Sequence, residues 1–430
     1  MDPRIPEAAS VTSSKLIKFT NCRLLRGDSL VKADLWISPE TGRVLHGQDV
    51  FYSQKLGPSK VIDLGGKILA PGFVETQVNG GFGFDFSNEC DNLSDYAKGV
   101  NKIRKGLVQF GVTSFLPTIT SQKTTLYKKV LPFLKPSSSI RSASQGAEIL
   151  GAHCEGPFIN PCRNGIHPKS VLVKPEDGFA SLAECYGADN LQGGSNSTVR
   201  LVTIAPELPG AIDAIADLDA RGIIASIGHS TTTYEHAISA LSAGASTITH
   251  LFNAMEPLHH RNPGIFGLLG VPSSNKPFFG LIADGIHLHA TCINLAWHAH
   301  REGCILVTDA MFAAGLPDGV YDWTNGDRIE KKGQVLHLVD SDGKIAGSAS
   351  TMIECINNFR NWTGASIAES LTAASRTPAR MLGIDGVKGV LEPGADADLV
   401  VLDDSEDAEG WKSLKIEQVW KFGEMVFKAD

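Results

Sequence analysis

The hydrophobic positions between residues 67 and 311 repeat one pattern: a short apolar run, a turn, and a stretch with helical spacing. Eight such runs predict eight strands, at residues 67–80, 113–120, 147–158, 199–207, 222–230, 246–255, 278–289 and 304–311. Amphipathic segments between them predict helices, for example at 209–221, 233–243 and 291–301. Continuous apolar strands that alternate with helices are typical of a parallel sheet covered on both faces. The pattern predicts an α/β fold with a closed (β/α)8 TIM-like barrel, and a doubly wound open sheet is the alternative.

The two ends of the chain differ from this central pattern. Short β-like segments such as KLIKFTNCRLL and ADLWIS occur before residue 67. Similar β-like segments, GADADLVVLD and EQVWKFGEMVFK, occur near the C-terminus. We therefore expect both ends to pair into one small β-sandwich domain beside the barrel. The predicted divisions are a disordered leader at 1–14, the first part of the small β domain at 15–66, the barrel at 67–390 and the second part of the β domain at 391–430.

Composition and charge narrow the class of protein. No apolar run approaches the roughly 20 residues that a membrane-spanning helix needs, so we expect no membrane contact. A formal net charge of −8 without any block of Lys or Arg argues against nucleic acid as a partner. The eight cysteines are scattered, and the N-terminus has no signal-peptide pattern. Free thiols and a cytoplasmic location are therefore expected.

Acidic and imidazole side chains lie at the C-terminal ends of five of the eight predicted strands. In a barrel, the C-terminal ends of the strands carry the reactive groups, so these residues should converge on one face. Each one alone has an ordinary explanation as a packing histidine, a helix cap or a turn residue. Their convergence instead predicts a catalytic site. The residues are Glu155, His229, His250, the pair Asp284 and His287, and Asp309.

Glu155, His229 and His250 come from three strands and form a three-ligand set with an open fourth position, as in catalytic zinc sites. A divalent ion there would lower the pKa of a bound water to about 7 and polarise a carbonyl oxygen. Asp309 lies on the last predicted strand and can move a proton from the water to a departing amine; its alternative role is a further metal ligand or a turn residue. The sequence thus predicts amide hydrolysis with one divalent ion. Zinc suits these ligands, and cobalt, nickel, manganese and iron(II) also accept them.

Eight motifs in a fixed order resemble the amidohydrolase superfamily and, within it, the N-acetylglucosamine-6-phosphate deacetylases. They are PGFVETQVNG, GAHCEGPFIN, IGHS, THLFNAM, DGIHLH, VTDAM, IAGSAS and GADADLVVLD, and the resemblance extends from Lys15 to Lys428. It implies hydrolytic deacetylation of N-acetyl-D-glucosamine 6-phosphate to D-glucosamine 6-phosphate and acetate. It also implies that Glu155, His229 and His250 bind the metal and that Asp309 is the acid/base residue.

The resemblance further implies how an amino-sugar phosphate is held. His167 matches a histidine near the acetyl carbonyl, and His287 matches a substrate-binding histidine. Arg261 matches an arginine that reaches the phosphate from the partner subunit, which implies a homodimer. The other implied substrate contacts are Ile166, Asn253, Ala254, Asp284, Gly285, Ile286 and a loop after the barrel made of Ile345, Ala346 and Gly347.

The first barrel strand departs from much of the superfamily. Many members carry His-x-His there and bind a second metal ion, because alternate side chains share one face of a strand. This chain has Gln77 and Asn79, whose amides are poor ligands for a zinc-like ion, so one ion per subunit is expected. The same pair occurs in a branch of the deacetylases. Glu75, where Asp is more usual, is a second, smaller departure.

Two other interpretations differ in what they require of these positions. A cyclic-amide hydrolase or a deaminase of the same superfamily usually retains His-x-His and often a carboxylated lysine. A non-enzymatic scaffold that had lost its metal would lack a ligand or the acid/base residue. All four positions are filled here, by Glu155, His229, His250 and Asp309. The sequence therefore favours the deacetylase over both alternatives.

Overall fold

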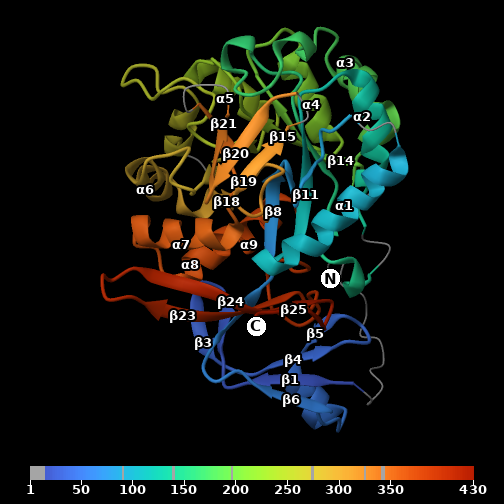
Figure 1. Ribbon diagram of the computed structural model, residues 1–430, viewed down its shortest axis with the longest axis vertical. Coiled ribbons are helices and arrows are strands. Elements are labelled where there is room, and N and C mark those ends of the chain that lie inside the picture. The colour runs from blue at the N-terminus through green and yellow to red at the C-terminus, as the bar shows by residue number, and fades with distance from the viewer. Residues whose placement is uncertain are drawn as a thin grey trace.

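The computed structural model describes residues 15–89, 92–137, 141–194, 197–272, 276–323, 326–339 and 344–430. The leader predicted at residues 1–14 lies outside this part of the chain. A barrel and a smaller β domain stack along the long axis of the molecule (Figure 1). Within the described ranges, no helix has the length and apolar character that a membrane crossing requires.

Eight parallel strands form the barrel, and each pairs with the next in chain order. The ring closes where Val78 makes a parallel bridge to Ala310, three residues beyond the last strand. The closed barrel predicted from the sequence is thus confirmed. Its strands are β8 (Phe73–Val78), β11 (Val112–Thr120), β13 (Ala152–Glu155), β14 (Val199–Ile204), β15 (Ile224–Ile227), β16 (Thr247–Ile248), β17 (Phe278–Ile282) and β18 (Cys304–Val307), and the short β12 (Glu148–Ile149) also pairs with β11.

The first predicted strand, residues 67–80, is two strands in the structure. β7 (Ile68–Pro71) pairs antiparallel with β23 (Leu399–Glu406) in the small domain, and β8 begins only after Gly72. A Cβ atom on Gly72 would lie 2.2 Å from Oγ1 of Thr113, so the backbone passes too close to its neighbour for any other residue. The chain leaves the small domain and enters the barrel at this glycine.

Helices cover the outside of the barrel, and their buried apolar positions join one large core with the strands. In α1, for example, Tyr96, Val100, Ile103 and Leu107 recur at helical spacing, and Asn92 caps the first turn by accepting the N–H of Ser94. The helices predicted at 209–221, 233–243 and 291–301 are α4, α5 and α6. The helices are α1 (Leu93–Leu107), α2 (Thr124–Val130), α3 (Phe179–Tyr186), α4 (Ala211–Ala220), α5 (Tyr234–Ser242), α6 (Ala290–Ala299), α7 (Met352–Thr363), α8 (Ile367–Ala373) and α9 (Arg376–Met381).

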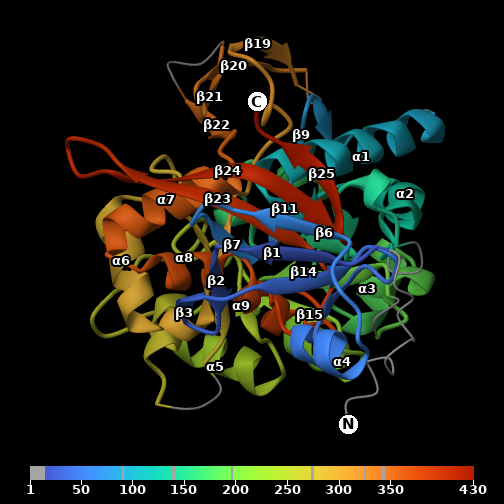
Figure 2. The same cartoon turned by 90° about the horizontal axis from the view of Figure 1, so that it is seen from below.

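The small domain consists of two packed sheets, as predicted, and both chain ends contribute to it. One sheet has the order β5-β4-β1-β6 and the other the order β25-β24-β23-β7-β2-β3. Figure 2 shows the red C-terminal strands beside the blue N-terminal ones. Phe19, Ile37, Leu399 and Trp420 belong to their common apolar core. The strands not yet given are β1 (Ile17–Thr20), β2 (Arg23–Arg26), β3 (Ser29–Lys32), β4 (Leu35–Ser38), β5 (Arg43–Leu45), β6 (Lys60–Asp63), β24 (Lys412–Lys421) and β25 (Glu424–Lys428).

A further antiparallel sheet follows the last barrel strand and was not predicted. Its strands are β19 (Gly319–Asp322), β20 (Arg328–Lys332), β21 (Val335–Leu338) and β22 (Ile345–Ser348). The prediction that residues 345–347 form a loop is wrong, because they lie in β22 and pair with β21. These strands are short, and the hairpin of β9 (Gly80–Gly81) and β10 (Phe84–Asp85) is shorter still.

Candidate metal centre and active site

A cavity of about 230 Å³ lies at the C-terminal ends of the barrel strands. Most of the predicted site residues line it. Thr120, Gly165 and Met311 also line it and were not predicted. The predicted residues in the lining are Asn79, Glu155, Ile166, His167, His229, His250, Asn253, Ala254, His287, Asp309, Ile345, Ala346 and Gly347.

The carboxylate of Glu155 is buried at the end of β13, and two imidazoles converge on it. His229 Nε2 lies 3.1 Å and His250 Nε2 lies 2.9 Å from the same oxygen, Oε1, and the two nitrogens are 3.0 Å apart. A tetrahedron with zinc–ligand bonds of about 2.0 Å has edges of about 3.3 Å, close to those of this triangle. The three predicted ligands are therefore arranged as one face of a tetrahedral site, and the residues fit a divalent ion.

The protonation of His229 agrees with this role. Its Nδ1 lies 2.7 Å from the backbone carbonyl of Arg163, which can only accept a hydrogen bond. The proton therefore resides on Nδ1, and the lone pair of Nε2 faces Glu155, as in metal-binding histidines whose other nitrogen is held by a carbonyl. Nδ1 of His250 is buried and has no hydrogen-bond partner within the described ranges.

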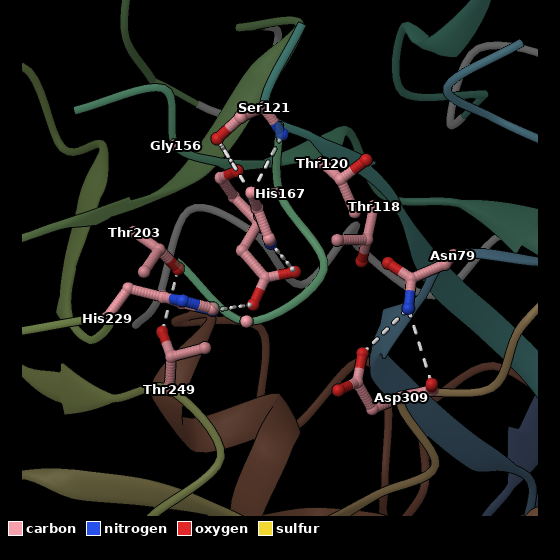
Figure 3. Close-up of polar contacts among 12 residues, drawn as sticks. Asn79, Thr118, Thr120, Ser121, Gly156, His167, Thr203, His229, Thr249 and Asp309 are labelled. Atoms are coloured by element: carbon pink, nitrogen blue, oxygen red, sulfur yellow. Dashed lines mark hydrogen bonds and ion pairs between the residues drawn. The ribbon is translucent and has the colours of Figure 1, made fainter. Parts of the chain in front are cut away.

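His167 has the opposite arrangement. The backbone N–H of Ser121 donates to its Nδ1 over 3.1 Å, and the hydroxyl of Ser121 lies 2.7 Å from the same nitrogen (Figure 3). Nδ1 is therefore an acceptor, and the neutral ring carries its proton on Nε2, which lies 3.9 Å from Oε2 of Glu155. Glu155, His167 and His229 are close enough together to hold an ion as a group. The proton on Nε2 makes His167 a hydrogen-bond donor into the cavity rather than a ligand.

Asp309 lies beside this centre, and the amides of Asn79 and Gln77 hold it; Figure 3 shows the contact with Asn79. Asn79 Nδ2 donates to Oδ1 of Asp309 over 2.7 Å. Gln77 Nε2 lies 3.3 Å from the same oxygen and 3.1 Å from Oε1 of Glu155, so it bridges the two carboxylates. Burial, together with the charge of Glu155, raises the pKa of Asp309 to about 6. A carboxyl with such a pKa is suited to accept and return a proton near neutral pH.

The electrostatics keep Glu155 ionised. Burial alone would raise its pKa, but the adjacent imidazoles of His229 and His250 hold that pKa well below its usual range. Burial opposes protonation of His250 as well, yet the contact with Glu155 raises its pKa. Burial lowers the pKa of His167 to about 3, so this ring stays neutral. The centre therefore presents a fixed negative charge, which favours a cation.

The two ligand histidines and the acid/base residue have left-handed backbone conformations. The φ angles are +49° at His229, +27° at His250 and +48° at Asp309, a region that residues other than glycine rarely occupy. Each of them lies two residues beyond the end of a barrel strand, where the unusual φ turns the chain. Such conformations cost on the order of 1–3 kcal/mol each and gather at functional sites. The sequence gives no sign of them.

Some of the other predicted site residues orient a cavity residue, and others lie away from the cavity. His287 Nδ1 lies 2.7 Å from Oδ2 of Asp284, whose Oδ1 accepts the backbone N–H groups of Ile286 and His287. Asp284 thus orients a cavity residue without lining the cavity itself. A Cβ on Gly285 would face Trp362 at 3.0 Å. Arg261 is exposed and is not among the residues that line the cavity.

Sequence reasoning missed two residues that fix the histidines. Ser121 determines which nitrogen of His167 accepts a hydrogen bond, and Arg163 does the same for His229 through its backbone carbonyl. A backbone group leaves no mark in the sequence, because any residue supplies it. Ser121 follows the second predicted strand directly, so its position at a strand end was the available signal.

A (β/α)8 barrel that gathers a carboxylate and two histidines beside a second carboxylate defines the class of metal-dependent hydrolases that act on amides. The chain belongs to the amidohydrolase family, whose sequence model matches residues 68–426.

Relatives within this family are similar over nearly the whole chain. The N-acetylglucosamine-6-phosphate deacetylase of Homo sapiens is 40% identical, with 97% of each chain covered. The N-acetylgalactosamine-6-phosphate deacetylase of Escherichia coli O157:H7 is 32% identical, with 94% of this chain and 99% of the other covered. A structure of an N-acetyl-D-glucosamine-6-phosphate deacetylase mutant from Mycobacterium smegmatis in complex with N-acetyl-D-glucosamine-6-phosphate is also similar. It has a TM-score of 0.76 and 28% identity, and the match covers 96% of this chain and all of that chain.

Proposed function

We propose that this chain deacetylates N-acetyl-D-glucosamine 6-phosphate, releasing acetate and D-glucosamine 6-phosphate. The observation that carries the proposal is the triangle of Glu155, His229 and His250 with Asp309 beside it in one buried cavity. A metal-binding triangle with an acid/base carboxylate beside it is the arrangement that hydrolyses an amide at neutral pH. Relatives with this named activity match nearly the whole length of the chain, which supports the choice of substrate.

Glu155, His229 and His250 are the residues that would hold one divalent ion, and we propose zinc. When bound, the ion supplies Lewis-acid polarisation of the acetyl carbonyl and lowers the pKa of water at the centre. Gln77 and Asn79 already donate to the carboxylates of Glu155 and Asp309, and their amides are poor ligands for a second ion. One ion per chain is therefore proposed.

Asp309 performs the proton transfers. Its carboxylate takes a proton from the attacking water as the new carbon–oxygen bond forms at the acetyl carbon. The carbon–nitrogen bond then breaks, and Asp309 returns the proton to the departing nitrogen, so that acetate and the free amine leave. His167, with its proton on Nε2, donates a hydrogen bond to the carbonyl oxygen as negative charge develops there.

Asn253, Ala254, His287 and residues 345–347 line the cavity, and we propose that they contact the sugar phosphate. Arg261 is exposed and outside its own cavity, so a role in phosphate binding requires that it serve a neighbouring chain. We propose a homodimer in which Arg261 of one chain reaches the phosphate in the other. A cytoplasmic location is also proposed, because the seven described cysteines are free thiols, and cell fractionation tests it.

The deciding experiment measures acetate release from N-acetylglucosamine 6-phosphate, from its galactosamine epimer and from unphosphorylated N-acetylglucosamine, with metal content determined on the same sample. We expect rapid turnover of the phosphorylated glucosamine derivative, about one ion per chain, and little turnover of the unphosphorylated sugar. Arg261→Ala should raise KM for the phosphorylated sugar by about tenfold or more, since a charge-assisted hydrogen bond contributes about 1.5–3 kcal/mol.

Each failure has a distinct meaning. Turnover of none of the three sugars by a metal-loaded sample would overturn the substrate assignment, and preference for the galactosamine epimer would replace N-acetylglucosamine 6-phosphate as the substrate. A monomeric mass by sedimentation, together with an unchanged KM for Arg261→Ala, would overturn the proposed dimer and the role of Arg261.

A further inference from the structure

The interior of the barrel is stratified beneath the metal centre. Alternate residues of a strand face inward, so successive inward residues form levels along the barrel axis. At the lower level the interior is apolar, and Leu116, Leu201 and Ile305 belong to one cluster there. Two positions further along β11 and β14, the inward residues are Thr118 and Thr203. Polar side chains thus replace the usual branched apolar ones directly below the ligands.

These polar residues form one continuous chain of hydrogen bonds. Oγ1 of Thr118 accepts the backbone N–H of Val78 over 3.1 Å and lies 3.3 Å from Nδ1 of His153. The other nitrogen of His153 lies 2.8 Å from the hydroxyl of Thr203. That hydroxyl is 2.7 Å from the hydroxyl of Thr249, which is 2.5 Å from the hydroxyl of Ser226 (Figure 3 shows the Thr203–Thr249 bond). We name Thr118, His153, Thr203, Ser226 and Thr249 the interior polar layer.

Every member of the interior polar layer is at most 4% exposed. Burying a hydroxyl or an imidazole is unfavourable unless it is hydrogen-bonded, and valine in place of threonine would fill the same space without that requirement. On β17 and β18 the interior stays apolar, with Ile282 and Val307. The five members of the layer therefore lie on, or directly after, strands that carry or flank the three ligands.

The layer includes or contacts a residue one or two positions before each ligand. His153 lies two residues before Glu155 on the same face of β13, and Thr249 directly precedes His250. Gly228 directly precedes His229, and a Cβ there would lie 2.8 Å from Cβ of Thr249 and 2.9 Å from Cγ2 of Thr203. The strand ends that bear the ligands thus rest on one hydrogen-bonded assembly.

We propose that the interior polar layer positions the three metal ligands and so sets the affinity of the centre for its ion; this inference rests on the proposed function. The layer fixes the separations of β13, β15 and β16 at the level just below the ligands. His229 and His250 have strained backbones and need such support to stay in place without an ion. The members of the layer are positioning residues, since none of them lines the cavity.

The experiment titrates Zn²⁺ into chelator-stripped full-length protein against a chromophoric chelator. Thr203→Val and Thr249→Val remove the two central hydroxyls with little change of shape. We expect each to weaken Zn²⁺ affinity by about 10–100-fold, the effect typical of residues that orient ligands from behind. The absorption spectrum of the Co²⁺-loaded variants should also shift, because the ligand geometry changes.

Thr363→Val is the matched control, because its buried hydroxyl donates to the carbonyl of Phe359 over 2.7 Å on α7. It should lower the thermal midpoint without changing Zn²⁺ affinity. If Thr203→Val or Thr249→Val fails to fold, Ser226→Ala can be tested instead, because Ser226 is the last member of the hydrogen-bonded series. It should also weaken Zn²⁺ affinity, but by less. Unchanged affinity and an unchanged Co²⁺ spectrum in folded variants would overturn the inference. Wild-type protein that binds no Zn²⁺ would instead overturn the proposed metal centre itself.

Discussion

At the scale of single residues, the position of a proton separates the roles of similar side chains. His229 and His167 both approach Glu155, but a carbonyl holds the proton of His229 on Nδ1, whereas a backbone N–H forces that of His167 onto Nε2. One ring therefore offers a lone pair to the centre and the other offers a donor. Asp309 is held by amide donors and has a raised pKa, which suits proton transfer.

This difference predicts distinct outcomes for three substitutions. His250→Asn should release the metal ion and abolish activity together, since it removes a ligand. His167→Asn should retain the ion and lower kcat by about 10²–10³, the usual loss for one donor to a developing oxyanion. Asp309→Asn should also retain the ion and lower kcat by about 10²–10⁴, because the acid/base group is gone. Metal analysis and steady-state kinetics on the same preparations measure both quantities.

Loss of the ion from His167→Asn, with His250→Asn still fully loaded, would exchange the roles assigned to these two histidines. Full activity of Asp309→Asn would mean that another group moves the proton.

Residues at strand ends could be found from the sequence because the barrel rule places them on one face, and the cavity brings together Glu155, His229, His250 and Asp309 as predicted. The sequence did not reveal the side chains of the interior polar layer, which lie beneath those residues inside the barrel. Thr203 and Thr249 are ordinary strand residues by composition, and only the closed barrel brings their hydroxyls together.

At the scale of elements, the sheet β19–β22 brings a strand to the cavity. Ile345, Ala346 and Gly347 of β22 line the cavity next to Met311, which lies beyond β18. Gly347 has φ +134°, and a Cβ there would lie 2.8 Å from Cγ of Met311. The close approach of β22 to the end of the barrel therefore depends on this glycine.

Gly347→Ala should push Met311 toward the cavity and lower kcat/KM by about tenfold or more, since strain at such a position is on the order of 1–3 kcal/mol. The metal content should not change. Gly333→Ala is the control, because it has φ +57° in the turn between β20 and β21 with no heavy atom within 4 Å of the added Cβ. Equal kinetics for the two variants would show that the Gly347 contact is irrelevant to the cavity.

The barrel strands were predictable because their apolar runs are long and alternate with amphipathic helices. The sheet β19–β22 was missed because its strands carry exposed and charged residues, such as RIEKK in β20, which give no clear alternation. The division of residues 67–80 into β7 and β8 was missed because both halves are apolar. Only the pairing of β7 with β23 distinguishes them.

At the scale of the whole molecule, a buried ion cluster joins the barrel to the small domain. Lys388 Nζ lies 2.5 Å from Glu148 at the base of the barrel, and 2.6 Å and 2.8 Å from Asp396 and Asp398. Lys421 lies 3.1 Å from Glu148 and 2.6 Å from Asp398. All five residues are at most 6% exposed. Removal of one partner would leave buried charge uncompensated.

Lys388→Met should lower the free energy of unfolding at pH 7 by about 3–5 kcal/mol, as is usual when one partner of a buried pair is removed. Urea unfolding measures the change. Lys98→Met, which removes an exposed pair with Asp95 on α1, should change stability little. A Lys388→Met protein as stable as wild type would show that the cluster does not hold the domains together.

The same cluster predicts a pH dependence. Burial raises the pKa of Glu148 and of Asp398, but Lys388 and Lys421 outweigh it and hold both pKa values below their usual range. Carboxyls of this kind stabilise the fold above their unfolded pKa of about 4 and lose that contribution as the pH falls through the folded pKa. The stability difference between wild type and Lys388→Met should therefore be full at pH 7 and narrow below about pH 4.

The meeting of the chain ends in one sheet has a consequence for synthesis on the ribosome. Arg23 of β2 pairs with Asp404 of β23, 381 residues later. At 5–20 residues per second, Arg23 emerges roughly 20–75 s before its partner. Until then β7, which enters the barrel through Gly72, lacks its neighbour β23. A nascent chain that stops early cannot complete this sheet, so an unfinished product exposes an open strand edge, the kind of surface that chaperones and proteases recognise.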